Sequence, residues 1–366
     1  MAILVTGGAG YIGSHMVWAL VEAGHEVVVL DRLSTGFRGA VAPGARFYLG
    51  DIGDRDLLRQ IFAHYPIEAI FHFAGSVVVS ESIANPMDYY INNTVNSSIL
   101  IEEAVRAGIG KLVFSSTAAV YGAPVEDRPV RETDPLRPQS PYGQSKLMTE
   151  LMLADMARAH PDFRFVALRY FNVAGCDAKG RTGQSTRGAT HLIKAACETA
   201  LGLRPHITVF GTDYPTRDGT GIRDYIHVDD LISAHQQALA YLQDGGPSLV
   251  ANCGYGDGAS VKEVIAAVER VAGQRLPTVF DAPRPGDAAC VIADPGLARQ
   301  HLGWMVDNPG LDAIVRTSLE WERRCLRTRA TPLEFVREKW KPVFPKRQTQ
   351  TKETRVCQVQ YEPDRL

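Results

Sequence analysis

Apolar and polar positions alternate in a regular way along the first half of the chain. Short apolar runs, which are typical of buried strands, occupy residues 2–5, 26–30, 46–49, 69–73, 111–114 and 165–169. Longer stretches with helical spacing of apolar residues lie at 14–23, 88–107 and 142–159. This alternation predicts an α/β fold, a doubly wound parallel sheet with helices on both faces.

The second half of the chain is less regular and richer in turns. Glycine and proline gather at residues 211–221, 254–258 and 283–286. We expect a first domain over residues 1–175 and a smaller C-terminal α/β domain, which binds the substrate, over residues 176–345. Parts near 225–245 are expected to pack back on the first domain. The polar stretch at 346–366 has few hydrophobic residues and is predicted to be disordered.

A glycine-rich loop, TGGAGYIG, follows the first apolar run. Gly7 allows a tight turn, Gly10 lets backbone N–H groups approach a pyrophosphate, and Gly13 lets the next helix pack on the strand. Tyr11 and Ile12, which lie between the last two of these glycines, belong to the same predicted cofactor site. Because a helix N-terminus is the positive end of its dipole, it attracts the same phosphates.

The second apolar run ends at Asp31, close to the distance expected for a carboxylate that holds an adenosine ribose. Its charge would repel a 2′-phosphate, so NAD is the expected cofactor, although Arg32 weakens this inference. Strand, glycines, helix, strand and acid in this order predict a Rossmann-type NAD-binding domain.

A second motif sets Tyr142 four residues before Lys146 in a predicted helix. Residues at this spacing share a helix face. A free phenol, with a pKa of about 10, is a poor base at neutral pH. We expect the ammonium of Lys146 to lower the pKa of Tyr142, so that Tyr142 is the base of a nicotinamide enzyme.

Composition narrows the class of partner. A net charge of -2 gives no sign of nucleic acid or an anionic membrane as partner, and no apolar run approaches membrane-spanning length. The chain enters the nucleotide fold at residue 2, which leaves no room for a signal peptide. Six cysteines without a CxxC pair suit reduced thiols in a cytoplasmic protein, and ten histidines without ligand spacing predict no metal site.

At this point the motifs carry a resemblance. The segments concerned are TGGAGYIGSH at 6–15, HFAG at 72–75, YYINN at 89–93, SSTAAVYG at 115–122, PYGQSK at 141–146, RYFN at 169–172 and DYPTRDGTGIRDYIHV at 213–228. Over about residues 1–343 the chain resembles the extended short-chain dehydrogenase/reductases, and within them the UDP-glucose 4-epimerases. Residues 213–228 are the most particular to these epimerases.

The resemblance implies which residues line the cofactor site. Lys146 would hold the nicotinamide ribose, and Tyr170 would lie against the nicotinamide. The other residues implied to line the NAD site are Asp31, Asp51, Ile52, Phe73, Ala74, Gly75 and Asn92.

The resemblance also implies a substrate site for a UDP-sugar. Thr117 would hydrogen-bond the sugar hydroxyl beside Tyr142. Two arginines suit a diphosphate and a carboxylate suits a ribose diol. The residues implied to hold the nucleotide part are Asn172, His191, Leu192, Phe210, Arg223, Arg284 and Asp287. Val291 would lie near the sugar 2-substituent, and its small size predicts room for an N-acetyl group.

The implied reaction inverts C4 of a UDP-hexose. Tyr142 would take the 4-hydroxyl proton, a hydride would pass to the nicotinamide, and the 4-keto sugar would turn and receive the hydride on its other face. The resemblance also implies a two-fold homodimer. The expected interface helices carry apolar residues beyond those that one sheet face needs, namely Val95, Ile99, Leu100, Leu147, Met148, Leu151 and Met152.

Two departures and several alternatives remain open. Val77 stands where these epimerases carry a lysine near the cofactor, which puts retention of NAD in question. Ala118 and Ala119 follow Thr117, where 4,6-dehydratases carry an acidic pair. Another nucleotide-sugar epimerase, a decarboxylase or dehydratase of the same family, and a non-catalytic NAD-binding sensor are the alternative functions.

Overall fold

The structure is a computed structural model, which describes residues 1–330 apart from 125, 127, 187, 285–286 and 307–308. The predicted disorder of residues 346–366 therefore lies outside the described residues. In the described part no helix is both long and apolar enough to cross a membrane.

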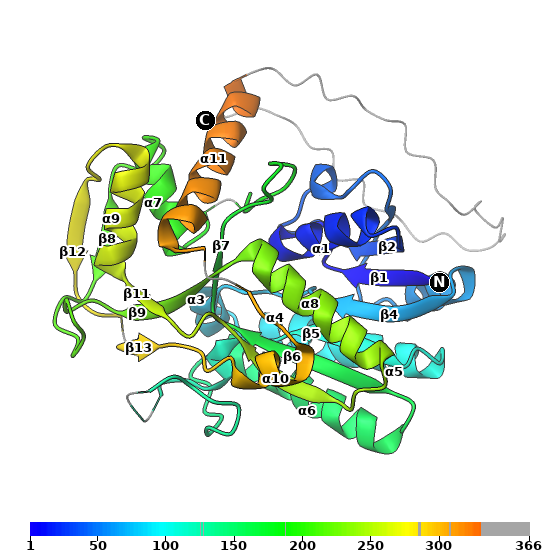
Figure 1. The fold of residues 1–366 in the computed structure, drawn as a ribbon. Coiled ribbons are helices and arrows are strands. Elements are labelled where there is room, and N and C mark those ends of the chain that lie inside the picture. Colours follow the sequence, from blue (N-terminus) through cyan, green and yellow to red (C-terminus); the bar gives the residue numbers. More distant parts are fainter. Residues whose placement is uncertain (125, 127, 187, 285–286, 307–308, 331–366) are drawn as a thin grey trace.

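A seven-stranded parallel sheet forms the centre of the molecule (Figure 1). The alternation of apolar runs and helices in the sequence had predicted it, and this prediction is confirmed. In spatial order its strands are β10 (Leu249–Cys253), β6 (Arg164–Tyr170), β5 (Lys111–Ser115), β4 (Ile67–His72), β1 (Ala2–Thr6), β2 (Glu26–Asp31) and β3 (Arg46–Leu49).

Helices cover both faces of this sheet because successive strand residues point to opposite sides. Ile3 and Val5 enter one apolar core and Leu4 enters the other. In the first core, α1 (Tyr11–Glu22) and α8 (Val228–Gln243) contact each other beside the sheet. The helices of the second core are α2 (Arg55–His64), α5 (Asn96–Arg106) and α6 (Pro141–Ala159).

The strand order reverses between β1 and β4. From β1 the chain proceeds to β2 and β3 on one side, and from β4 to β5 and β6 on the other. Ligands of doubly wound sheets bind at such a reversal, outside the carboxyl ends of the strands. The glycine loop, the HFAG segment and Thr117 follow β1, β4 and β5 respectively, so the fold brings these three predicted segments to one edge.

A smaller group of elements lies beside the carboxyl edge of the sheet (Figure 1). Its strands are β7 (Asn172–Ala174), β8 (Ile207–Phe210), β9 (Ile222–His227), β11 (Gly258–Ser260), β12 (Thr278–Asp281) and β13 (Cys290–Val291). Its helices, which pack on one another, are α7 (Leu192–Ala200), α9 (Val261–Ala272) and α11 (Leu311–Ala330). We call these elements the small lobe. Although β10 and α8 lie late in the chain, they belong to the large sheet and its cover.

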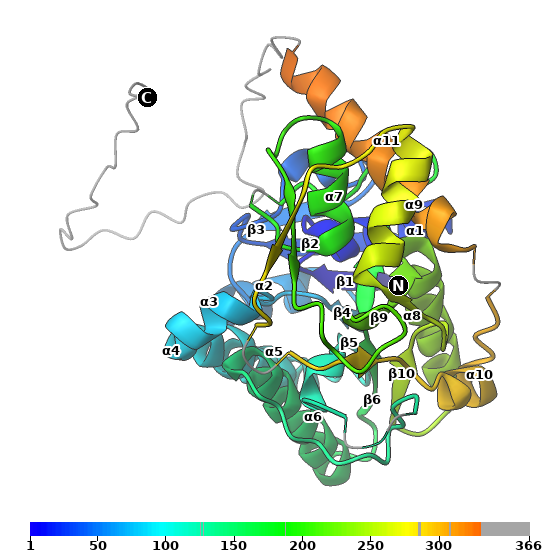
Figure 2. The ribbon, with the colours of Figure 1, turned by 90° about the vertical axis from the view of Figure 1, so that its left-hand side faces the viewer.

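The remaining elements are short. They are the helices α3 (Val79–Ala84), α4 (Pro86–Tyr89) and α10 (Gly296–Leu302), the π-helix η2 (Tyr90–Val95), and the 3₁₀ turns η1 (Arg38–Ala40) and η3 (Ala118–Val120). Figure 2 shows α3 and α4 beside α5 and α6. The helical stretch predicted over 88–107 is confirmed, and in the structure it consists of α4, η2 and α5 in direct succession. A π-turn adds a residue to the helix, and such turns often mark functional sites.

Candidate functional site

The glycine loop has the shape that a bound pyrophosphate needs. Gly7 has φ +71°, and a Cβ there would lie 2.6 Å from the backbone nitrogen of Ala74. A Cβ on Gly13 would lie 2.2 Å from the carbonyl oxygen of Gly7. A Cβ on Gly10 meets only that same oxygen, at 3.2 Å, so this position opens outward. The loop therefore leaves a backbone cradle at the start of α1, where the helix dipole is positive.

Asp31 shapes the rim of this cradle. Its carboxylate accepts hydrogen bonds from the backbone nitrogens of Ala9, at 2.9 Å, and Leu33, at 2.7 Å. Leu33 is held at φ 59°, which is uncommon for a residue other than glycine. Each carboxylate oxygen keeps acceptor capacity beyond these bonds, so the geometry fits a ribose diol as well as the loop.

Asp51 and Ile52 follow β3 on the same edge. One Asp51 oxygen accepts from the backbone of Gly53 and from the Asn96 side chain, at 2.8 and 2.9 Å. The other oxygen pairs with Arg32 at 2.8 Å. Ile52 is buried. Asp51 is thus held in place as a hydrogen-bond acceptor. Arg32, which follows Asp31 in the sequence, forms its ion pair with Asp51.

The start of α6 places Tyr142 next to Thr117. Ser140 caps the helix by accepting a hydrogen bond from Gly143, and Pro141 occupies its first position. A Cβ on Gly143 would lie 2.6 Å from the carbonyl oxygen of Ala119. Since glycine lacks that atom, the first turn of α6 approaches the segment after β5 closely.

The charge state of Tyr142 differs from the sequence-based expectation. Burial raises the pKa of the phenol above 10.0, although a hydrogen bond with the Thr117 side chain opposes the increase. The prediction that Lys146 lowers this pKa is wrong for the arrangement found here. The ammonium of Lys146 donates instead to the carbonyl oxygen of Ser115, at 2.9 Å.

Lys146 itself is buried below the carboxyl end of β5. Its Nζ lies 4.8 Å from the centre of the Phe114 ring. Burial lowers the pKa of Lys146 to about 8, and the Glu150 carboxylate opposes this decrease. Tyr170, at the end of β6, has its pKa raised by burial and by the charge of Tyr142. The structure therefore brings the three predicted catalytic residues and Tyr170 together.

The segment after β4 forms the opposite wall. A Cβ on Gly75 would lie 3.5 Å from the Nζ of Lys146 and 3.1 Å from the Oδ1 of Asn93. Asn93 accepts from the backbone nitrogen of Ser76 at 2.7 Å and donates to its carbonyl oxygen at 2.9 Å. Asn92, the residue that the resemblance singled out, donates to the Ser76 hydroxyl at 2.9 Å. Asn93 was not predicted from the sequence as a site residue. The one indication was its position next to Asn92 in the YYINN motif.

Phe73 and Ala74 complete this wall. Both are partly buried and pack against the two cores, and their backbone is the part that Gly7 approaches. The glycine loop and the segment after β4 therefore approach each other closely along one side of the cradle. The predicted cofactor residues thus surround one continuous edge of the sheet.

A pocket at the start of the small lobe contains Asn172, His191 and Leu192. Asn172 begins β7, and His191 immediately precedes α7. The His191 ring lies 2.7 Å from the amide nitrogen of Gln184, and burial lowers the pKa of this histidine. These three predicted residues therefore share one cavity, which Tyr225 of β9 and Trp321 of α11 also line.

The other predicted nucleotide residues meet on β8, β9 and the segment before β13. The guanidinium of Arg284 lies 4.0 Å from the centre of the Phe210 ring, at the end of β8. Arg223, on β9, forms an ion pair with Asp287. Val291, on β13, is half-buried and pairs with Arg223 in the strand register. Sequence spacing gave no means of deducing that these residues converge.

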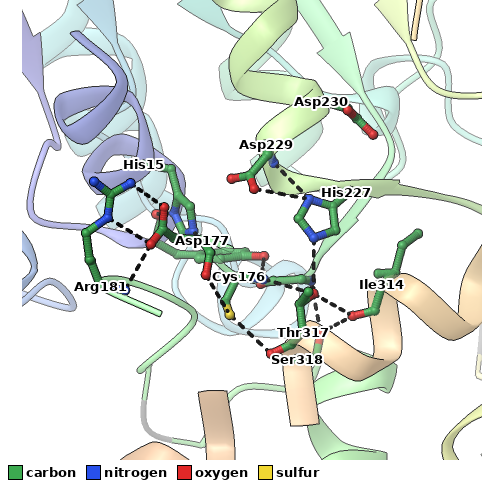
Figure 3. Close-up of polar contacts among 12 residues, drawn as sticks. His15, Cys176, Asp177, Arg181, His227, Asp229, Asp230, Ile314, Thr317 and Ser318 are labelled. Carbon is green, nitrogen blue, oxygen red and sulfur yellow. Dashed lines mark hydrogen bonds and ion pairs between the residues drawn. The ribbon is translucent and has the colours of Figure 1, made fainter. Parts of the chain in front are cut away.

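A polar cluster ties the glycine-loop helix to the small lobe (Figure 3). His15, on α1, accepts from the backbone nitrogen of Asp177 at 3.0 Å, so its other ring nitrogen donates to Tyr11 at 2.7 Å. His227 accepts from the backbone nitrogen of Asp229 at 3.1 Å and donates to Thr317 on α11. Burial lowers the pKa of His15 to about 4 and that of His227 as well. Both rings are therefore neutral. His15 fixes α1 to the segment after β7, and His227 fixes β9 to α11.

The hydroxyl of Tyr11 adds a bond to this junction, because it donates to the carbonyl oxygen of Gly175 at 2.7 Å. Ile12 packs partly buried against the same core. In the described part of the chain, no three His, Cys, Asp or Glu side chains gather as a metal ion would require. The site chemistry visible here is that of phenol, hydroxyl, ammonium and guanidinium groups.

Comparison with known proteins decides what kind of site this is. Residues 3–254 match the model of the NAD dependent epimerase/dehydratase family. The chain belongs to this family. The resemblance inferred from the motifs is thereby confirmed, and so is NAD as the cofactor, because the epimerase/dehydratase family is NAD-dependent.

Relatives within the epimerase/dehydratase family are similar over most of their length. A UDP-glucose 4-epimerase of Azospirillum brasilense is 55% identical over 321 residues, which cover 88% of this chain and 92% of the relative. A solved UDP-glucose-4-epimerase from Stenotrophomonas maltophila, with bound NAD and formylated UDP-arabinopyranose, has a TM-score of 0.86 at 40% identity, covering 90% of this chain and 99% of that one. The UDP-Glc/GlcNAc 4-epimerase from Campylobacter jejuni has a TM-score of 0.78 at 44% identity, covering 88% and 99%.

Proposed function

We propose that this protein is an NAD-dependent epimerase that inverts C4 of a UDP-hexose through a 4-keto intermediate. The observation that carries the proposal is the meeting of Tyr142, Thr117 and Lys146 at the sheet edge that also carries the glycine cradle. UDP-glucose and UDP-galactose are the proposed substrates, in keeping with the names of the relatives.

Tyr142 and Thr117 handle the proton in this scheme. When bound, NAD supplies a nicotinamide that takes up a hydride from the sugar and returns it. Tyr142 removes the proton of the 4-hydroxyl group and later gives it back, and Thr117 holds that oxygen beside the phenol. Lys146, whose ammonium donates to the carbonyl oxygen of Ser115, would hold the nicotinamide ribose. Asp31, Asp51 and the segment from Phe73 to Gly75 hold the cofactor.

Inversion requires a firm grip on the nucleotide and a loose grip on the hexose. Arg223 and Arg284 suit the diphosphate, because a guanidinium forms bidentate bonds to phosphate oxygens. Asp287 suits the ribose hydroxyls, and Phe210 offers a flat apolar face to the base. With binding energy concentrated there, the 4-keto sugar turns about its pyrophosphate link and presents its other face.

Val291 sets the breadth of substrate in this proposal. It is half-buried on a two-residue strand rather than part of a core, and it lies beside Arg223. A valine leaves more room than a tyrosine, so we propose that UDP-N-acetylhexosamines are accepted too. The Campylobacter jejuni enzyme, which acts on both sugar types according to its name, shows that the fold permits this breadth.

The purified protein tests both statements. It is incubated with UDP-glucose in one reaction and UDP-N-acetylglucosamine in another, and the sugar products are identified. UDP-galactose in the first reaction supports the main proposal, and UDP-N-acetylgalactosamine in the second supports the broad pocket. A dehydrated or decarboxylated product would instead support the other members of the family. Ala118 and Ala119 stand against dehydration, since they carry no acid to expel water.

A homodimer is part of the proposal. Ile91 and Val95 on η2 and Leu151 on α6 are exposed apolar side chains, and η2 and α6 contact each other. Of the apolar residues noted in the sequence, Leu100 and Leu147 are buried within the protomer, so only part of that set is available. We also propose a cytoplasmic location, which suits the buried free thiols Cys176, Cys197 and Cys253.

A further inference from the structure

A buried ion pair lies one helical turn beyond the catalytic lysine. Glu150 is on α6, four residues after Lys146 and on the same face. Its side chain is 5% exposed and that of its partner Arg169, on β6, is 4% exposed. Arg169 donates from Nη2 at 2.6 Å and from Nε at 3.0 Å to the two oxygens of Glu150. This is the fork geometry of a strong charge-assisted pair.

Arg169 is held from its other side as well. Its Nη1 donates to the hydroxyl of Tyr121 at 3.0 Å, and its guanidinium lies 5.0 Å from the centre of that ring. The Tyr121 hydroxyl donates in turn to Asn252 at 2.8 Å. Burial opposes the charge of Arg169, but the bonds to Glu150 outweigh it and raise the pKa of the guanidinium. The pair is therefore permanently charged and rigid.

Glu150 also reaches the strand that carries Thr117. The hydroxyl of Ser116 donates to its carboxylate. The adjacent residue, Ser115, accepts at its carbonyl oxygen from Lys146. Two successive residues at the end of β5 are thus bonded to two side chains of α6, and the next residue is Thr117, which bonds Tyr142. A shift of Ser116 would move Thr117 relative to the phenol.

The charge of Glu150 matters because Lys146 is only 3% exposed. The titratable groups that interact with its charge come from two elements, namely His72 on β4 and Glu150 on α6. His72 is neutral, since burial lowers its pKa to about 3. Within the described surroundings, Glu150 is the group whose charge stabilises the ammonium.

We propose that Glu150 is a positioning residue for the epimerase reaction. Its carboxylate fixes Thr117 against Tyr142 through Ser116, and its charge keeps Lys146 in the ammonium form that donates to the end of β5. This inference rests on the proposed function, since it assigns Lys146 a charged role in the reaction. The Glu150 side chain thus has two roles, one in the position of Thr117 and one in the charge of Lys146. Different substitutions can separate these roles.

The test measures the titration of Lys146 directly, by carbon-13 NMR of protein labelled at the lysine Cε. The Lys146 signal is assigned by its loss in K146M. In E150Q the titration midpoint should fall by about one pH unit, and the alkaline limit of kcat should fall with it. S116A is the matched control, because it removes the hydroxyl and keeps the charge. It should lower kcat about tenfold at every pH while the Lys146 midpoint stays in place.

If E150Q does not fold, the Lys146 titration is measured in the double variant E150L/R169M instead. Apolar replacement of both members of a buried pair is often neutral for stability, and this variant too should lower the Lys146 midpoint. An unchanged midpoint in the folded variants would overturn the inference. A wild-type protein that epimerises no UDP-hexose would overturn the proposed function instead, and the NMR titration would still report on Glu150.

Discussion

Val291 lies directly beside Arg223, because β13 and β9 pair in parallel with these two residues in register. The residue proposed to limit the sugar is therefore fixed to the strand that is proposed to hold the diphosphate. A change of side chain at Val291 alters the pocket without moving Arg223, since the strand register is set by backbone bonds.

The first test enlarges this side chain. We expect Val291→Tyr to reduce turnover of UDP-N-acetylglucosamine by roughly tenfold or more, because the N-acetyl group would meet the ring, while UDP-galactose turnover is largely kept. Steady-state rates on the two substrates measure the effect, and Val291→Ile serves as the control of similar shape. Equal losses on both substrates would show that Val291 is not a selective wall.

A second test removes the phenol. We expect Tyr142→Phe to lower kcat by about 10²–10⁴-fold, the usual contribution of a general acid–base group. UDP affinity, measured by calorimetry, should stay within a few-fold because Phe210, Arg223, Arg284 and Asp287 are left intact. If the variant kept more than a third of wild-type activity, Tyr142 would not be the base.

Val77 offers a test of cofactor retention. It is 49% exposed and follows the HFAG segment, whose backbone at Phe73 and Ala74 the glycine loop approaches. We expect Val77→Lys to slow the release of NAD, since an ammonium attracts the pyrophosphate. The NAD content after repeated gel filtration measures this effect. The control is Val77→Met, which adds length without charge and should leave the content unchanged.

The exposed apolar surface on η2 and α6 predicts self-association. Leu151 is 56% exposed although it is an apolar residue of a well-packed helix. In a two-fold dimer this surface would meet its own copy, so that Leu151→Glu places two carboxylates close together. Light scattering should give a dimer for the wild type at micromolar concentration and a monomer for the variant. A monomeric wild type would refute the dimer.

The stability of the protein should depend on pH through His72. Burial, aided by the charge of Lys146, lowers its pKa to about 3, while an unfolded histidine has a pKa of about 6.5. The unfolded state therefore binds the extra proton first as the pH falls. Stability is full above pH 6.5 and decreases below it, by up to about 4 kcal/mol at pH 3. Chemical denaturation over this range should show a shallower dependence in His72→Asn.

Much of the site could be predicted from the sequence because its residues follow strands. In a parallel sheet the carboxyl ends of strands meet at one edge, so Asp31, Gly75 and Thr117 converge whatever the details of packing. The spacing of Tyr142 and Lys146 likewise follows from helix geometry alone. These predictions needed only local pattern and the rules of the fold.

Other features depend on contacts that local pattern does not contain. The bond of Lys146 goes to Ser115 rather than toward Tyr142, because the end of β5 lies nearest to its ammonium. The stacking of Arg284 on Phe210 joins the segment between β12 and β13 to the end of β8. The π-helix at η2 was invisible to hydrophobic spacing, since one added residue barely changes the apolar pattern.

The position of β10 has a consequence for synthesis. This strand pairs with β6 at the edge of the large sheet, but the chain makes it only after β7, β8 and β9. While the protein emerges from the ribosome, the outer edge of β6 remains unpaired until Cys253 has been added. An unpaired strand edge is a site where chains can associate wrongly, so this interval exposes the nascent protein to misassembly at β6.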